Sequence, residues 1–163
     1  MSRATKVAFA LAVIAVATVP LLRRQRQTEA DSDPDPEHVI RSYLDAWADG
    51  DDDALDDVLA DDYQGHRHTV SGTEDYDRDE LAARIEAHAQ AFDRVDYDLE
   101  QVVVSDGEVA CRINMRAHHR ETRRDAETSG LAIFRLKDGK IAEEWSSWDY
   151  LGLAEQLGLS ASG

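Results

Sequence analysis

The sequence has a single cysteine, Cys111, among its 163 residues. One thiol cannot form a disulfide within the chain, and it cannot build a cysteine-based zinc site. Cys111 stands in the alternating apolar stretch Val109, Cys111, Ile113 and Met115. Such alternation predicts a buried structural thiol rather than a reactive one.

Lysine is nearly absent as well, because Lys6, Lys137 and Lys140 are the only three and the remaining cations are arginines. Acidic residues outnumber basic ones by 34 to 18, which gives a formal net charge of -16 at pH 7. This charge argues against nucleic acid as a partner. An acidic, lysine-poor composition is typical of halophilic proteins, because dense carboxylates keep a protein soluble when salt screens their repulsion.

Long hydrophobic runs are missing except for residues 7–22, which carry no charge and have basic residues on both sides. This run is short for a membrane span, which takes about 17–25 apolar residues. Its basic start, apolar middle and Ala15-Val16-Ala17 sequence also suit a cleaved signal peptide. Three alternatives stay open: an uncleaved membrane anchor, a cleaved signal and an untranslocated tail. We expect membrane association through residues 7–22 or export, with the side of the membrane undetermined because both flanks are positive.

The chain divides into four parts by composition. Residues 1–26 form the hydrophobic N-terminal segment, and residues 27–36 form an acidic, proline-bearing linker. Residues 37–158 form one domain, and residues 159–163 form a short tail. A chain of this length suits one domain with an appendage.

The first half of the domain shows helical periodicity. Asp35 can cap a helix whose first residue is Pro36, and Gly50 ends it. A short helix is predicted over 54–59 and a longer one over 80–92, with an irregular or short extended segment at 62–73 between them.

The second half changes to the period of two that is typical of strands. Strands are predicted over 95–104 and 109–119, followed by a loop over 121–127 and a hairpin whose turn is Lys137-Asp138-Gly139-Lys140. A short helix, capped by Asp149, then closes the domain over 150–157. Helices followed by antiparallel strands predict an α+β domain with its helices packed on one face of a bent sheet.

The order of these pieces resembles the SnoaL-like polyketide cyclase and ester cyclase family of the nuclear-transport-factor-2-like superfamily. The resemblance covers nearly all of 37–158. It is carried by the first helix with its Asp-rich continuation, by the segment DYQGH at 62–66, and by DGKIAEEWSSWDYLGLAEQLG at 138–158. The family fold implies a cone-shaped curved antiparallel sheet with helices on its concave face, enclosing one pocket.

The sequence departs from the family at the closing strand. Relatives usually have Trp-Asp-x-x-Asp there, whereas this chain has Ser146 after Trp145 and keeps only the later Asp149. The resemblance implies that the missing aspartate is the cyclase acid/base. Serine cannot be a general base near neutral pH unless another group activates it. The cyclase activity therefore does not transfer with the resemblance, although we expect the pocket to be retained.

Candidate site residues follow from the residue types and from the resemblance. Asp149, expected to be buried among Trp145, Trp148 and Tyr150, is the candidate acid/base, and capping the final helix is its structural alternative. His66 is its candidate catalytic partner, because relatives place a histidine there at the pocket mouth. The predicted ligand-binding residues are Tyr43, Trp47, Tyr63, Met115, Trp145 and Ser146.

No metal or cofactor is expected. His66 and His68 alternate and could share one face, but no third ligand converges with them in the pattern. Polar residues at 112, 114, 116, 118 and 120 line the other face of their strand, where they are solvated, contact a second copy in a homodimer or bind an anion.

Two functional hypotheses remain. The first is an enzyme that binds a small apolar molecule and transfers a proton, in the manner of a cyclase or an isomerase. The second is a non-catalytic ligand-binding or dimerisation module that kept the pocket after losing the first aspartate.

Overall fold

The computed structural model describes residues 34–159. The predicted N-terminal segment 1–26, most of the linker and most of the tail lie outside the described residues, so these expectations stay predictions. Within the described part of the chain, no helix is long and apolar enough to cross a membrane.

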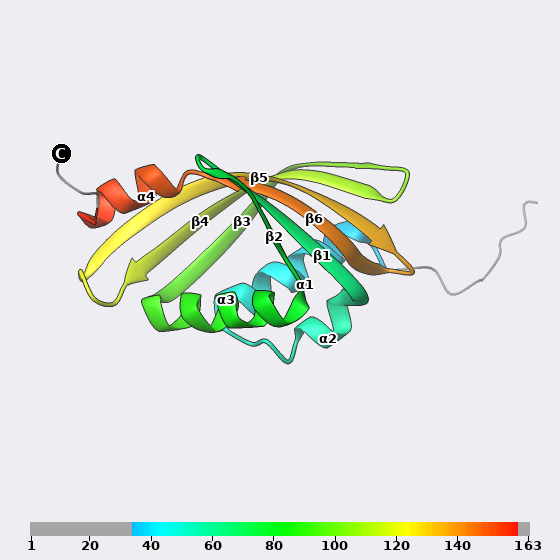
Figure 1. The fold of residues 1–163 in the computed structure, drawn as a ribbon, viewed down its shortest axis with the longest axis horizontal. Coiled ribbons are helices and arrows are strands. Elements are labelled where there is room, and N and C mark those ends of the chain that lie inside the picture. Colours follow the sequence, from blue (N-terminus) through cyan, green and yellow to red (C-terminus); the bar gives the residue numbers. More distant parts are fainter. Residues whose placement is uncertain (1–33, 160–163) are drawn as a thin grey trace, which may run out of the picture. The chain divides into compact units, whose positions relative to one another are not determined.

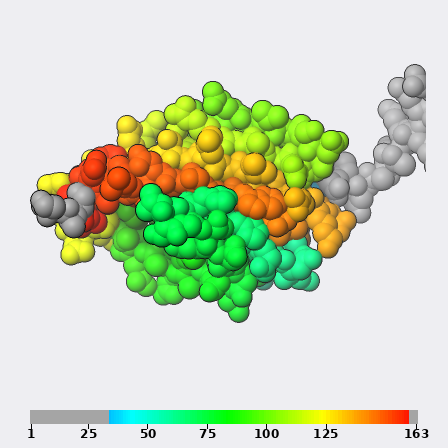
Figure 2. All heavy atoms as spheres, turned by 45° about the horizontal axis from the view of Figure 1, so that its top comes forward, coloured from blue at the N-terminus to red at the C-terminus, as the bar shows by residue number. Residues whose placement is uncertain are grey.

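In the described part of the chain, six strands form one curved sheet (Figure 1). They are β1 (Leu59–Thr69), β2 (Gly72–Tyr76), β3 (Phe92–Ser105), β4 (Glu108–His119), β5 (Arg124–Lys137) and β6 (Lys140–Trp148). Their order is β2-β1-β6-β5-β4-β3. In Figure 2 the green hairpin of β2 and β1 lies beside the orange β6, and the yellow to yellow-green strands β5, β4 and β3 follow on its other side. All neighbours are antiparallel except β1 and β6, which run parallel, a pairing that the sequence did not indicate.

Two long helices lie under the concave side of the sheet (Figure 1). Helix α1 (Pro36–Asp49) begins at a proline after the capping residue Asp35 and ends at Gly50, whose φ of 69° is left-handed. Helix α3 (Arg78–Ala91) begins with a capping box in which Asp77 and Glu80 accept each other's backbone N–H groups. The short helix α2 (Leu55–Val58) leads into β1, and α4 (Tyr150–Leu157) packs against β5. The predicted α+β fold, with helices on the concave face of a curved sheet, is confirmed.

The core lies between the concave face and the helices. On β4 the buried residues are Val109, Cys111, Ile113, Met115, Ala117 and His119, which alternate with exposed or partly exposed ones. Cys111 is buried, as predicted, and this burial raises the pKa of its thiol to about 12.

A β-bulge on β6 decides which residues of that strand face the core. Arg135 of β5 pairs with Glu143 while Leu136 pairs with Ile141, so one residue of β6 is left over between them. An extra residue reverses the side to which all later side chains point. As a result, Glu144 and Ser146 are buried, whereas Glu143 and Trp145 lie on the outer side.

Candidate functional site

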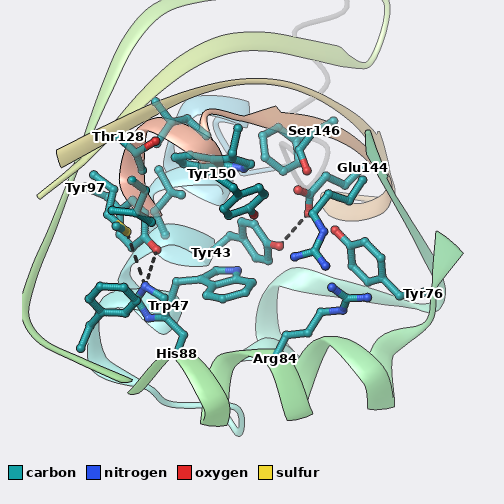
Figure 3. A pocket seen from close by; sticks show the side chains of 18 residues that line it. Tyr43, Trp47, Tyr76, Arg84, His88, Tyr97, Thr128, Glu144, Ser146 and Tyr150 are labelled. Atoms are coloured by element: carbon teal, nitrogen blue, oxygen red, sulfur yellow. Dashed lines mark hydrogen bonds between the residues drawn. The ribbon is translucent and has the colours of Figure 1, made fainter. Parts of the chain in front are cut away.

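A cavity opens between the concave face of the sheet and helices α1 and α3, with a volume of about 730 Å³ including the space at its mouth (Figure 3). Most of its lining is apolar or aromatic. The lining residues are Tyr43, Leu44, Trp47, Arg67, Tyr76, Arg84, His88, Phe92, Tyr97, Ile113, Met115, Thr128, Phe134, Glu144, Ser146, Trp148, Tyr150 and Leu153. A concave, mostly apolar cavity with a few polar groups is the usual form of a small-molecule site.

Glu144 is the only carboxylate in this lining, and it is 5% exposed. The hydroxyl groups of Tyr43 and Tyr63 both donate to its Oε2 atom, over 2.7 Å and 2.9 Å. Burial, and next the nearby Glu144, raise the pKa of each tyrosine far above its ordinary value, so both remain hydrogen-bond donors. No side chain of residues 34–159 hydrogen-bonds to the other carboxylate oxygen, Oε1.

The opposite end of the cavity holds a neutral histidine. His88 rises from α3 between aromatic rings, and burial lowers its pKa to about 4. Its Nε2 atom lies 3.4 Å from the Tyr97 hydroxyl and 3.5 Å from the Met115 sulfur, whereas its buried Nδ1 atom has no partner among the described residues. Such a ring nitrogen can exchange a hydrogen bond with a polar atom of a bound molecule.

The structure brings most of the predicted ligand-binding residues together. Tyr43, Trp47, Met115 and Ser146 line the cavity. Tyr63 does not line it, but supports it from behind by holding Glu144. Within residues 34–159, no group of three metal-ligating side chains could hold a metal ion.

Three predicted residues lie elsewhere. The expected burial of Asp149 is wrong, since its side chain is exposed and accepts the Gly152 N–H at 2.8 Å, which caps α4. Trp145 faces outward because of the bulge and stacks on His66, with ring centroids 5.4 Å apart. His66 therefore lies on the outer side of the sheet, away from the cavity. We propose no role for these three side chains in chemistry inside it.

His66 instead joins three strands. Its Nδ1 atom lies 2.7 Å from Asp75 on β2, and its Nε2 atom lies 3.1 Å from Glu143 on β6. The hydrogen bond to Asp75 is the largest influence on the pKa of His66, followed by burial, which opposes it, and by Glu143; together they raise this pKa above its ordinary value. The charged imidazolium is thus favoured in the folded state.

We expect His66→Gln to destabilise the domain more at pH 6 than at pH 9. A raised pKa in the folded state stabilises the fold below the unfolded pKa of about 6.5, and this contribution disappears as the pH rises through the folded pKa. The difference between the two pH values should be up to about 1 kcal/mol, because the site is near the surface. Urea unfolding of both proteins measures it, with His68→Gln, which removes a histidine bonded to the Thr73 hydroxyl, as the control. An equal loss at both pH values would contradict the assignment.

Glu144, Arg84 and His88 line the cavity but were not among the site residues predicted from the sequence. Arg84 and His88 stand four residues apart on α3, a spacing that places both on one helix face. Glu144 shares the alternation of Ser146 and Trp148 on β6, and this signal was available. Adjacent residues of a strand point to opposite faces, so Trp145 and Ser146 could not both have lined one pocket.

The curved sheet, the helices on its concave face and the cavity between them define an α+β protein with the fold of the nuclear-transport-factor-2-like and ketosteroid-isomerase-like proteins. The family model of the SnoaL-like domain matches residues 40–144, more than half of the chain. The chain therefore belongs to the SnoaL-like domain family. No curated protein sequence matches it significantly.

Several solved structures resemble the domain. IdmH, a candidate polyketide cyclase from Streptomyces antibioticus, is 25% identical with a TM-score of 0.67, over 76% of this chain and 98% of its own. AclR, a candidate hydroxylase from Streptomyces galilaeus, is 17% identical with a TM-score of 0.68, over 80% of this chain and 89% of its own. A Catenulispora acidiphila protein in complex with trimethylamine is 14% identical with a TM-score of 0.66, over 81% of this chain and 98% of its own. Because AclR and the Catenulispora acidiphila protein are less than 25% identical to this chain, their similarity shows a shared fold and nothing about function.

Proposed function

We propose that the domain binds a small, mostly apolar molecule that carries a carbonyl oxygen, and transfers a proton on it with Glu144 as the acid/base. One observation carries this proposal: a single buried carboxylate in a mostly apolar cavity has one oxygen held by two tyrosines and the other without a side-chain partner among the described residues. A general base must be held in place and yet keep one atom within reach of the substrate.

Glu144 takes the place of the acid that the family has at Ser146. The two residues are two positions apart on β6, so both face the cavity, where Ser146 is 4% exposed. In the proposed reaction, Glu144 Oε1 accepts a proton from the carbon beside the carbonyl, the C–H electron pair forms an enolate, and the proton returns to the same or another carbon. Exclusion of water from an apolar cavity strengthens such electrostatic effects.

The apolar lining suits the body of such a molecule. Trp47, Met115, Trp148 and Leu153 contribute flat or flexible apolar surfaces around the cavity. A neutral His88 adds a polar contact without the cost of a buried charge. The description of the relative IdmH as a candidate polyketide cyclase supports a substrate that carries ketone groups.

A second function is favoured by Ser146. Because the family's acid is missing at this position, the domain could have kept the cavity as a ligand-binding module without catalysis. In that case Glu144, Tyr43 and Tyr63 form a hydrogen-bonded network that shapes the cavity floor and performs no chemistry.

Deuterium incorporation separates the two functions. Cyclic ketones of one to three rings, 2-tetralone among them, are incubated with the protein in D₂O, and loss of the proton signals beside the carbonyl is followed by NMR. The enzyme hypothesis predicts saturable acceleration over buffer alone. Saturable binding without any acceleration would favour the binding module, and the absence of both binding and acceleration across the series would contradict the proposed function.

A further inference from the structure

One end of the cavity carries two guanidinium groups. Arg67 reaches it from β1 and Arg84 from α3, and their side chains are only 25% and 28% exposed. The chain as a whole has a net charge of -16. Two largely buried arginines in a mostly apolar cavity are unusual in a protein this acidic. Because they are not on the open surface, solubility does not explain their presence.

Each guanidinium group lies over an aromatic ring. Arg84 lies over the Tyr76 ring at 4.6 Å from its centroid, and Arg67 lies over the Tyr150 ring at 5.4 Å. Figure 3 shows Arg84 beside Tyr76, at the end of the cavity where Glu144 also lies and away from His88. A guanidinium that stacks on a ring uses its face, so the N–H groups along its edge stay available for an oxygen acceptor.

The protein supplies these N–H groups with too few acceptors. A single carboxylate oxygen, Oε2 of Glu74, serves both arginines, at 2.5 Å from Arg67 and at 3.6 Å from Arg84, and the Tyr150 hydroxyl is a further partner of Arg67 alone. The Glu74 side chain is 47% exposed, so water competes for it. The Nε atom of Arg67 is buried without a partner among the described residues. Buried donors are normally paired, so this N–H group needs an acceptor from outside the described residues, and a ligand oxygen in the cavity could supply it.

We propose that Arg67 and Arg84 bind an anionic oxygen of the ligand, as presented by a carboxylate or by an enolate. This inference rests on the proposed function, because it specifies the molecule that the same cavity binds. The anionic oxygen lies at the arginine end near Glu144, and the apolar body extends toward Trp47 and His88. If the oxygen is that of the enolate formed by proton transfer, the arginines stabilise the charge that develops there.

Matched ligands test the inference. 2-Naphthoate carries a permanent anion, 2-naphthamide has the same shape without charge, and 2-naphthol becomes an anion only if the site ionises it. Calorimetric titrations with the full chain should show that wild type binds the naphthoate at least about tenfold more tightly than the amide. Alternatively, or in addition, the absorption spectrum of bound 2-naphthol should show that its pKa is lowered. A preference for naphthoate indicates a carboxylate ligand, and ionisation of naphthol alone indicates an enolate.

Substitutions of the arginines test whether they cause the preference for 2-naphthoate over 2-naphthamide. Arg84→Met keeps the apolar stem on Tyr76 and should abolish the preference, whereas Arg84→Lys keeps the charge and should retain part of it. Arg41→Met is the matched control, because Arg41 is half exposed on α1 and its one ion-pair partner within residues 34–159 is Glu37. Thermal unfolding of each variant checks that it folds.

Three outcomes would overturn the inference. Equal binding of naphthoate and amide, together with an unshifted naphthol, would overturn it while leaving the cavity a small-molecule site. A preference that survives in both Arg84→Met and Arg67→Met would place the anion elsewhere. Failure of every ligand to bind would contradict the proposed function as well.

Discussion

Replacing Glu144 by glutamine is expected to lower the rate of deuterium incorporation into the responsive ketone by about 10²–10⁴-fold, the usual contribution of a general acid or base. Glutamine has nearly the shape of glutamate, and its amide oxygen can still accept from Tyr43 and Tyr63. The loss should therefore appear in the rate, while the ketone still binds and the domain still folds. NMR exchange rates at saturating ketone, with melting temperatures alongside, measure this.

Glu143→Gln provides a matched control. Glu143 is the neighbouring residue of the same type, but it faces the outer side, where it pairs with Arg135 and His66. The same change of charge, one residue away, should leave the exchange rate within about twofold of wild type, since surface charges are screened. If both variants lost the same fraction of the rate, Glu144 would not be the acid/base, and the loss would reflect net charge or stability.

Replacing Gly65 by alanine is expected to destabilise the domain by roughly 2–4 kcal/mol. A Cβ atom at this position would lie 2.2 Å from two ring atoms of Tyr76, which is itself 5% exposed. The backbone of Gly65 cannot retreat, because it pairs with Tyr76 on β2 and with Glu144 on β6. Urea unfolding of the variant and wild type gives the difference in free energy.

A double-mutant cycle identifies the cause of this loss. In a Tyr76→Ala background the ring is gone, so adding Gly65→Ala should cost less than about 1 kcal/mol. The same cost in both backgrounds would mean that alanine is rejected for another reason, such as the backbone conformation. The cycle also bears on the site, because Gly65 makes room for the ring on which Arg84 stacks.

The elements that the sequence predicted have strong local signals. Pro36 after Asp35 and the left-handed Gly50 bound α1, and the turn at 137–140 produces the hairpin of β5 and β6. Strand β1 was harder to predict from the sequence, because its segment LADDYQGHRHT is polar and lacks a clear alternation of apolar and polar residues. It becomes a strand through pairing with β2 and with β6, which is distant in sequence, and single-sequence patterns do not report such pairing.

The site was only partly predictable for a related reason. The closing strand and its inward Ser146 followed from the family pattern, but the bulge before Glu143 fixes which of two adjacent residues faces in. Local sequence does not announce this bulge. The long-range hydrogen bonds from Tyr43 and Tyr63 to Glu144 join residues 101 and 81 positions apart, so they too appear only in the folded chain.

The three tryptophans of the chain allow the most direct measurement of the central claim, that the cavity is the ligand site. Trp47 and Trp148 line the cavity, whereas Trp145 stacks on His66 outside it. Indole N–H signals, assigned by single Trp→Phe variants, are followed by two-dimensional NMR while 2-naphthoate or 2-tetralone is added. We predict saturable shifts of the Trp47 and Trp148 signals and none for Trp145. A shift confined to Trp145, or no saturable shift with either compound, would contradict the central claim.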